Sequence, residues 1–211
     1  MKRFLAGLIT LLLLAVPASA TVALLGAGPG TSCTPQVTPG GGLYTSDDLV
    51  TGWTTTRATK TTNTLSGFPS CVTNGAKLTE DSTASATHLT AHTITASILV
   101  QAYTVTVYTT QVNGTRNLLV TLQNSSFTNN ASITINPSTC ATVQGPTVSA
   151  GWSSVSGSAT AQSNSWCKIT LTVTTIVDTG FTLQLNMRSG TSSSYSGDGT
   201  SAIGLWGVDV R

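Results

Sequence analysis

The segment that decides the fold reads Tyr103-Thr104-Val105-Thr106-Val107-Tyr108. Large apolar side chains alternate with threonine, so Tyr103, Val105 and Val107 lie on one face of an extended chain. A strand with one buried face and one solvated face produces this period of two. The segment therefore predicts a half-buried β-strand.

The same β-branched, alternating pattern recurs on the C-terminal side of this segment. It is found at residues 118–122, 133–135, 169–173, 181–185 and 203–210. Turn sequences such as Asn113-Gly114 and Gly197-Asp198-Gly199 fall between the runs, and no helical period is sustained. The pattern predicts an all-β domain over residues 43–211, a single antiparallel β-sandwich of roughly eight to ten strands.

The first 20 residues have the features of a signal peptide. Lys2 and Arg3 precede an apolar run over 4–16, which is shorter than the roughly 20 residues needed to span a bilayer, and Ala18-Ser19-Ala20 matches a cleavage site. We expect cleavage after Ala20 and a secreted or cell-surface protein; an uncleaved anchor is the alternative. Residues 21–42, rich in Gly, Pro, Ser and Thr, are expected to be a linker.

Composition excludes two classes of protein. Only 8% of residues are charged, and removal of Lys2 and Arg3 takes nine basic residues to seven, against seven acidic ones. A neutral chain of this kind offers no basic surface for nucleic acid and is not an acidic disordered protein. After signal cleavage no membrane segment is expected.

The four cysteines are consistent with an exported protein. An even number in an exported chain predicts two disulfides, and three pairings are open. Cys140–Cys167 and Cys33–Cys71 close the shorter loops and are the favoured pairs. No two cysteines have the close spacing of a tetrathiolate zinc site.

The acidic residues do not form a recognisable catalytic pair. Glu80 is the only glutamate, and its neighbour Asp81 would point to the opposite face of a strand. A glycosidase needs two carboxylates that face each other, and pairing Asp81 with Asp198 or Asp209 has no local support. We expect these acids to cap turns or to accept backbone hydrogen bonds.

Two histidines, His88 and His92, are four residues apart within a strand-like segment. On a strand this separation is about 13 Å, too far for both rings to bind one metal ion. They are expected to be surface residues, and no motif for a nucleophile or a phosphate loop is present. The sequence therefore predicts that the protein is not an enzyme.

Aromatic side chains on loops are the candidates for ligand binding. Trp152 lies in a turn-like segment, and Tyr195 lies in a Ser-rich loop with Asp198. Exposed aromatic rings stack on sugars while polar groups bond to hydroxyls, so Trp152, Tyr195 and Asp198 are the predicted ligand-binding set; anchoring of the loops is the equal alternative. The other three tryptophans, predicted to pack in the core, are Trp53, Trp166 and Trp206.

A series of segments carries a family resemblance. They are residues 44–48, 53–56, 75–81, His88, 103–108, the strand after Trp166, and 194–207. In this order they resemble the jelly-roll domain of bacteriophage head-spike and tail-fibre proteins, which is similar to carbohydrate-binding modules and galactose-binding-like sandwiches. The resemblance covers 43–211 and is most specific over 197–207.

The resemblance implies a non-catalytic sandwich used for attachment, decoration or glycan contact, with no catalytic residues to transfer. Two features depart from it. The family shows Trp-Tyr-Arg-Cys where this chain has Trp166-Cys167-Lys168-Ile169. A signal peptide is unusual for a virion protein and favours an exported cellular or prophage-derived protein.

Related sugar-binding sandwiches often hold a structural calcium ion. Asp47, Asp48 and Asp209 would supply oxygen ligands here. Ordinary turn acids are the favoured interpretation, because calcium needs six or more oxygen ligands. No other cofactor is expected.

Two functions follow. The first is a carbohydrate-binding or attachment module that contacts a glycan or polysaccharide through loop aromatics and polar residues. The alternative is a structural virion protein (spike, fibre or decoration) or surface protein, whose sandwich binds other virion or surface proteins.

Overall fold

A computed structural model describes residues 42–46, 49, 51–62, 65, 67 and 75–211. The predicted signal peptide, nearly all of the linker, and Cys33, Cys71, Asp47 and Asp48 lie outside these residues. Within the described part, no helix is long and apolar enough to cross a membrane.

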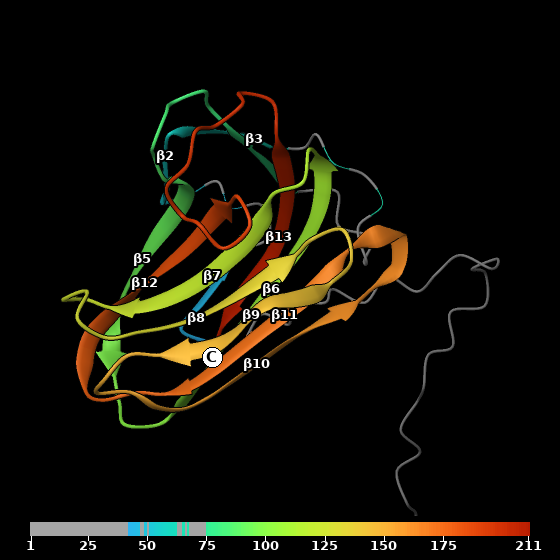
Figure 1. Ribbon diagram of the computed structural model, residues 1–211. Coiled ribbons are helices and arrows are strands. Elements are labelled where there is room, and N and C mark those ends of the chain that lie inside the picture. The colour runs from blue at the N-terminus through green and yellow to red at the C-terminus, as the bar shows by residue number, and fades with distance from the viewer. Residues whose placement is uncertain (1–41, 47–48, 50, 63–64, 66, 68–74) are drawn as a thin grey trace, which may run out of the picture. The chain divides into compact units, whose positions relative to one another are not determined.

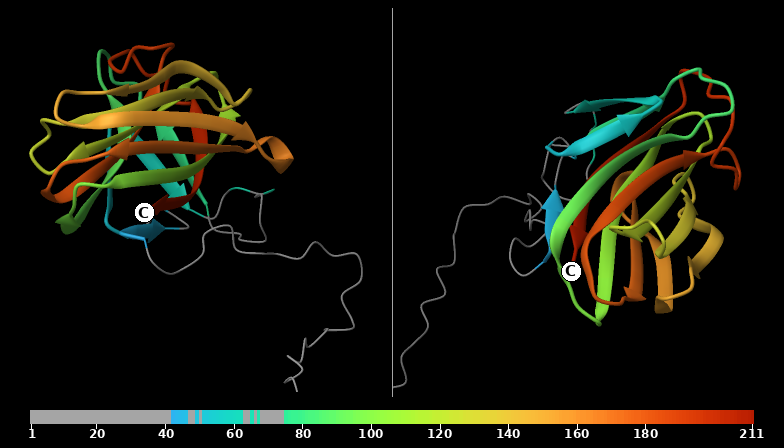
Figure 2. Two further views of the ribbon diagram at one scale, coloured as in Figure 1. Left: turned by 90° about the horizontal axis from the view of Figure 1, so that it is seen from below. Right: turned by 90° about the vertical axis from the view of Figure 1, so that its left-hand side faces the viewer.

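The described residues form two antiparallel sheets that pack face to face (Figures 1 and 2). The seven-stranded sheet has the order β10-β11-β6-β13-β4-β3, and β1 also pairs with β13. Its strands are β1 (Tyr44–Ser46), β3 (Ala58–Thr62), β4 (Ala76–Glu80), β6 (Ala102–Asn113), β10 (Ser153–Ala161), β11 (Cys167–Thr174) and β13 (Ala202–Val210). The predicted all-β antiparallel sandwich is confirmed.

The six-stranded sheet has the order β2-β5-β12-β7-β8-β9. Its strands are β2 (Trp53–Thr56), β5 (His88–Ile98), β7 (Asn117–Asn124), β8 (Asn130–Asn136), β9 (Ala141–Val148) and β12 (Asp178–Arg188). The described residues thus form thirteen strands, more than the eight to ten expected. The additional strands are short or lie at sheet edges, where Thr, Ser and Gly leave little apolar alternation to detect.

The core lies between the sheets and follows the predicted alternation. Tyr103, Val105 and Val107 of β6 all point inward and are fully buried. The Tyr103 ring meets Phe181 of β12 edge to face, with 5.1 Å between the ring centroids. Aromatic rings prefer this geometry, and the contact links the two sheets near the β5–β6 loop.

A second apolar cluster covers the outer face of the seven-stranded sheet. Tyr108, Trp166 and Trp206 are buried there, with Leu65 packed against them. The register pairs Tyr108 with Trp206, so both point away from the inward residue Val107. The predicted burial of Trp53, Trp166 and Trp206 is confirmed.

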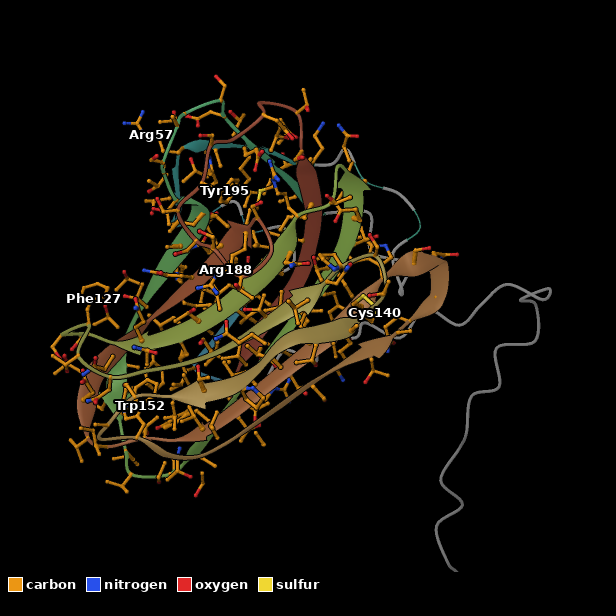
Figure 3. All side chains as sticks on the ribbon, viewed as in Figure 1. Arg57, Phe127, Cys140, Trp152, Arg188 and Tyr195 are labelled. Atoms are coloured by element: carbon orange, nitrogen blue, oxygen red, sulfur yellow. A yellow bond between two sulfur atoms is a disulfide. The ribbon has the colours of Figure 1, made fainter. Side chains whose placement is uncertain are left out.

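One disulfide joins the two sheets. Cys140, in the turn between β8 and β9, bonds to Cys167 at the first position of β11 (Figure 3). The favoured pairing of these two cysteines is therefore confirmed. The other proposed pair, Cys33–Cys71, lies outside the described residues.

Candidate functional site

Two regions of the described sandwich concentrate polar side chains. One is a hydrogen-bonded network around Glu80, at the end of β4. The other is the outer face of the six-stranded sheet. The first contains two of the residues that the sequence predicted as a ligand site, so it is considered first.

Glu80 is 2% exposed, and each of its hydrogen-bond partners is a donor. Arg116 binds the carboxylate through two nitrogens, at 2.9 Å from Nε and 2.6 Å from Nη2. The Tyr195 hydroxyl donates at 2.6 Å, and the Asp198 backbone N–H donates at 2.8 Å. The Arg116 charge balances the charge of this buried carboxylate, and the donors satisfy its oxygens. We therefore interpret Glu80 as a residue that stabilises the fold.

Tyr195 anchors the loop between β12 and β13. Its ring lies 4.7 Å below the Arg116 guanidinium and 4.8 Å from the His88 ring, and its backbone pairs with Ala86. Burial and the hydrogen bond to Glu80 raise the pKa of the Tyr195 hydroxyl. These contacts support the loop-anchoring alternative and leave no free ring face for a sugar between Arg116 and His88.

Asp198 closes the same loop. Its carboxylate accepts hydrogen bonds from the Ser201 hydroxyl and backbone N–H, each at 2.6 Å, and from the Thr200 N–H at 2.7 Å. These bonds lower the pKa of Asp198. The structure therefore brings Tyr195 and Asp198 together, as predicted, but uses both to fix the loop to β4.

Acid is expected to weaken this network. The lowered pKa means that the Asp198 carboxylate stabilises the fold above its ordinary pKa of about 4, and that this stability is lost as the pH falls below that value. Urea denaturation between pH 7 and pH 2.5 should show the free energy of unfolding decreasing below pH 4. Asp198→Asn should flatten this decrease; an unchanged pH profile in the variant would contradict the assignment.

Trp152, the third predicted ligand residue, is not an exposed platform. It is 5% exposed and meets Phe181 edge to face at 5.8 Å between ring centroids. Gly151, with a φ of +99°, turns the chain so that the Trp152 ring enters the core (Figure 3). The composition of this segment correctly predicted a turn of the backbone. It carries no information on the direction in which the Trp152 side chain points.

The expectation of two surface histidines is wrong for His88. Its ring is fully buried, and Nδ1 lies 2.6 Å from the Arg57 carbonyl oxygen. His92 is half-buried, stacks on Tyr44 at 4.1 Å and bonds to the Gly52 carbonyl. Both histidines occupy inward positions of β5, where carbonyl groups of the neighbouring segments satisfy one ring nitrogen of each.

The calcium hypothesis rests on one described residue. Asp209 binds Arg211 through Oδ2 at 2.5 Å, and its Oδ1 atom is buried without a hydrogen-bond partner. Among the described residues, no three His, Cys, Asp or Glu side chains are grouped as metal ligands. Asp47 and Asp48 lie outside those residues, so the ion stays a hypothesis.

The second region is the outer face of the six-stranded sheet, which we call the polar sheet face. The register of β12, β7, β8 and β9 places its members side by side. They are Thr182, Gln184, Asn186, Arg188, Asn117, Leu119, Thr121, Gln123, Asn130, Ser132, Thr134, Gln144 and Thr147. The face is almost entirely polar, and no carboxylate is among these residues.

Several residues of the polar sheet face are buried although they point away from the core. Asn186 is 4% exposed and Thr134 is fully buried. The β12–β13 loop folds over this end of the face, because the Asn117 side-chain nitrogen donates to the Gly190 carbonyl at 2.8 Å. Arg188 donates to the Thr191 carbonyl of the same loop at 2.8 Å (Figure 3).

Four hydrogen-bonding atoms of this face are buried and have no partner among the described residues. They are Gln123 Oε1, Thr134 Oγ1, Asn186 Oδ1 and Arg188 Nε. An unpaired buried polar atom costs about 1–3 kcal/mol, and folded proteins keep few of them. Four of the ten such atoms found among the described residues therefore lie on this one sheet face.

This face was not predicted from the sequence, although a signal for it was present. From Gln184 to Arg188, amides and a guanidinium occupy every second position. Elsewhere, as in β6 and β11, threonine fills most of the outward positions. This difference in side-chain length and hydrogen-bonding capacity separates the two outer faces.

No protein-family model matches the chain, and no curated protein matches it. Among solved structures, the chain is similar to the CBM22-1 xylan-binding domain of Paenibacillus barcinonensis Xyn10C, with 12% identity and a TM-score of 0.47, over 82% of this chain and 94% of that one.

It is also similar to the CBM22-1–GH10 modules of Clostridium thermocellum xylanase 10B in complex with xylohexaose (12% identity, TM-score 0.45, 81% of this chain and 28% of that one). A third similar chain is the enzymatically active domain of tailspike protein 4 of bacteriophage CBA120 (13% identity, TM-score 0.42, 76% of this chain and 19% of that one). At this level of similarity, none of the three chains assigns a family, a ligand or an activity to this one.

Proposed function

We propose that the domain is a non-catalytic carbohydrate-binding module whose ligand lies along the polar sheet face. The observation that carries the proposal is the group of four unpaired, buried hydrogen-bonding atoms on this face. Sugar hydroxyls act as both donors and acceptors, so they suit a face that offers amide, hydroxyl and guanidinium groups together.

The absence of a carboxylate from the polar sheet face supports binding without catalysis. Glycoside hydrolysis needs a pair of carboxyl groups beside the scissile bond. The buried carboxylate nearest to such a role, Glu80, is held by Arg116 and Tyr195 in the other polar region. The proposal therefore assigns no reacting group to the face that would hold the sugar.

The first test is a glycan-array screen with the purified chain and a Gln184→Ala variant. Gln184 is half-buried at an outward position of β12, with Thr121 beside it on β7. Loss of one or two hydrogen bonds, each contributing about 0.5–1.5 kcal/mol, should reduce the affinity for the bound glycan by roughly tenfold. Calorimetric titration of the best array ligand measures this change.

Thr106→Ala is the matched control, because Thr106 is half-buried at an outward position of β6 on the opposite sheet. It should leave the affinity unchanged. If no glycan binds to the folded protein, the proposal fails. If a glycan binds equally well to wild type, Gln184→Ala and Gln123→Ala, the ligand does not occupy the polar sheet face.

One observation favours the structural alternative. Of the seven large apolar side chains that are exposed in the described part of the chain, five lie on three loops at one end of the sandwich: Leu99, Val100, Phe127, Ile176 and Val177. Thr175 bonds to the Leu99 carbonyl at 2.9 Å, and Asn124 bonds to Asp178 at 3.1 Å, which holds the three loops together. An apolar end of this kind suits contact with another protein, and a failed glycan screen would make that role the leading one.

A further inference from the structure

Arg188 is the one basic residue among the members of the polar sheet face. It occupies the last position of β12, and its Nη1 atom reaches the Gln144 side-chain oxygen on β9 at 3.2 Å. The same atom donates to the Thr191 carbonyl at 2.8 Å. The guanidinium therefore reaches across β7 and β8. It is held by two neutral acceptors, one on β9 and one in the β12–β13 loop.

The charge of Arg188 is not balanced by the described residues. Their ion pairs join Asp81 with His88, Glu80 and Asp198 with Arg116, and Asp209 with Arg211. Arg188 takes part in none of these, and burial lowers the pKa of its guanidinium. An arginine keeps its proton under such conditions, so a partly buried cation remains without a counter-charge.

The geometry of the guanidinium shows which of its edges has no hydrogen-bond partner among the described residues. Both hydrogen bonds leave from Nη1, and Nε is buried without a partner. The unused edge of the fork, formed by Nε and Nη2, has the spacing of the two oxygens of a carboxylate. A neutral hydroxyl would satisfy one of these donors and would leave the charge unbalanced.

We propose that the glycan bound by the polar sheet face carries a carboxylate, as uronic acids do, and that Arg188 is the specificity-determining residue that pairs with it. This inference rests on the proposed function. Asn186 Oδ1, two positions before Arg188 on the same face of β12, is a buried acceptor without a partner among the described residues. A densely charged polymer such as nucleic acid would need several cations, and this face has one.

The test is an array that presents each uronic-acid glycan beside its carboxyl-reduced counterpart, followed by titration of the best pair. The acidic member should bind at least tenfold more tightly than the reduced one. Arg188→Ala should lower the affinity for the acidic member on the order of tenfold to a hundredfold and should bring the two members to similar affinities. Arg188→Lys, which keeps the charge but not the fork, should lie between wild type and Arg188→Ala.

Lys168→Ala is the matched control. Lys168 is a half-buried cation at an outward position of β11, on the opposite sheet, and its loss should leave the preference unchanged. Circular dichroism and thermal unfolding establish that each variant is folded.

Three results separate the inference from the proposed function. Equal affinity for both members, with binding weakened by Gln184→Ala but not by Arg188→Ala, overturns the inference and leaves the proposed function intact. A preference for sulfated over carboxylated glycans also overturns it. Failure of the folded wild-type protein to bind any glycan refutes the proposed function itself.

Discussion

Replacing Glu80 by alanine is expected to lower the free energy of unfolding by about 3–5 kcal/mol, because it leaves the Arg116 charge without its buried partner. The Arg116 side chain is 14% exposed, so water cannot fully replace the carboxylate. The same substitution removes the acceptor of the Tyr195 hydroxyl and of the Asp198 backbone N–H. Urea denaturation monitored by tryptophan fluorescence measures the change.

Glu80→Gln serves as the comparison for this prediction. The amide keeps the shape of the side chain and one acceptor oxygen but loses the charge. Its effect should lie between those of wild type and Glu80→Ala. A loss below 1 kcal/mol in Glu80→Ala would show that the network around this residue is not a main anchor of the β12–β13 loop.

Removal of the Cys140–Cys167 disulfide is expected to cost about 3–4 kcal/mol in the chain-entropy estimate, because the bond closes a loop with a sequence separation of 27 residues. The double variant Cys140→Ala, Cys167→Ala removes the bond without leaving a reactive thiol. Alanine also avoids placing a hydroxyl at position 167, which is fully buried. Denaturant titration of the oxidised wild type and of the variant gives the difference.

Cys140→Ala alone distinguishes the bond from the side chains. Residue 140 lies at the surface end of a turn with a φ of +57°, so its own packing contributes little. If the single and double variants lose the same stability, the loss comes from the bond. If only the double variant is destabilised, packing of Cys167 is responsible and the entropic explanation is wrong.

The long central strands were predictable from the sequence, and the edge strands were not. In β6, β7, β11 and β12, apolar side chains alternate along the chain, because each of these strands has one face against the core. In β10, Ser and Ala dominate and the inward positions are only half-buried, so the alternation leaves little apolar pattern in the sequence. Amino-acid pattern therefore identifies strands by their contact with the core rather than by their hydrogen bonds.

The site was only partly predictable, for a different reason. Tyr195 and Asp198 were correctly placed together on one loop, but their partners Glu80 and Arg116 come from distant parts of the sequence. Whether a loop aromatic faces solvent or a buried carboxylate depends on such tertiary contacts. Trp152 shows the same limit, because a turn sequence fixes the backbone and leaves the direction of the ring to the core.

The position of β13 has a consequence for the exchange of backbone protons with solvent. This strand hydrogen-bonds to β6 on one side and to β4 and β1 on the other, and all nine of its residues are buried. The core covers one face, and the cluster around Trp206 lies on the other. Local opening cannot reach its amides, so their exchange rates are set by the global unfolding equilibrium, whereas amides of the exposed edge strand β10 exchange through small local fluctuations.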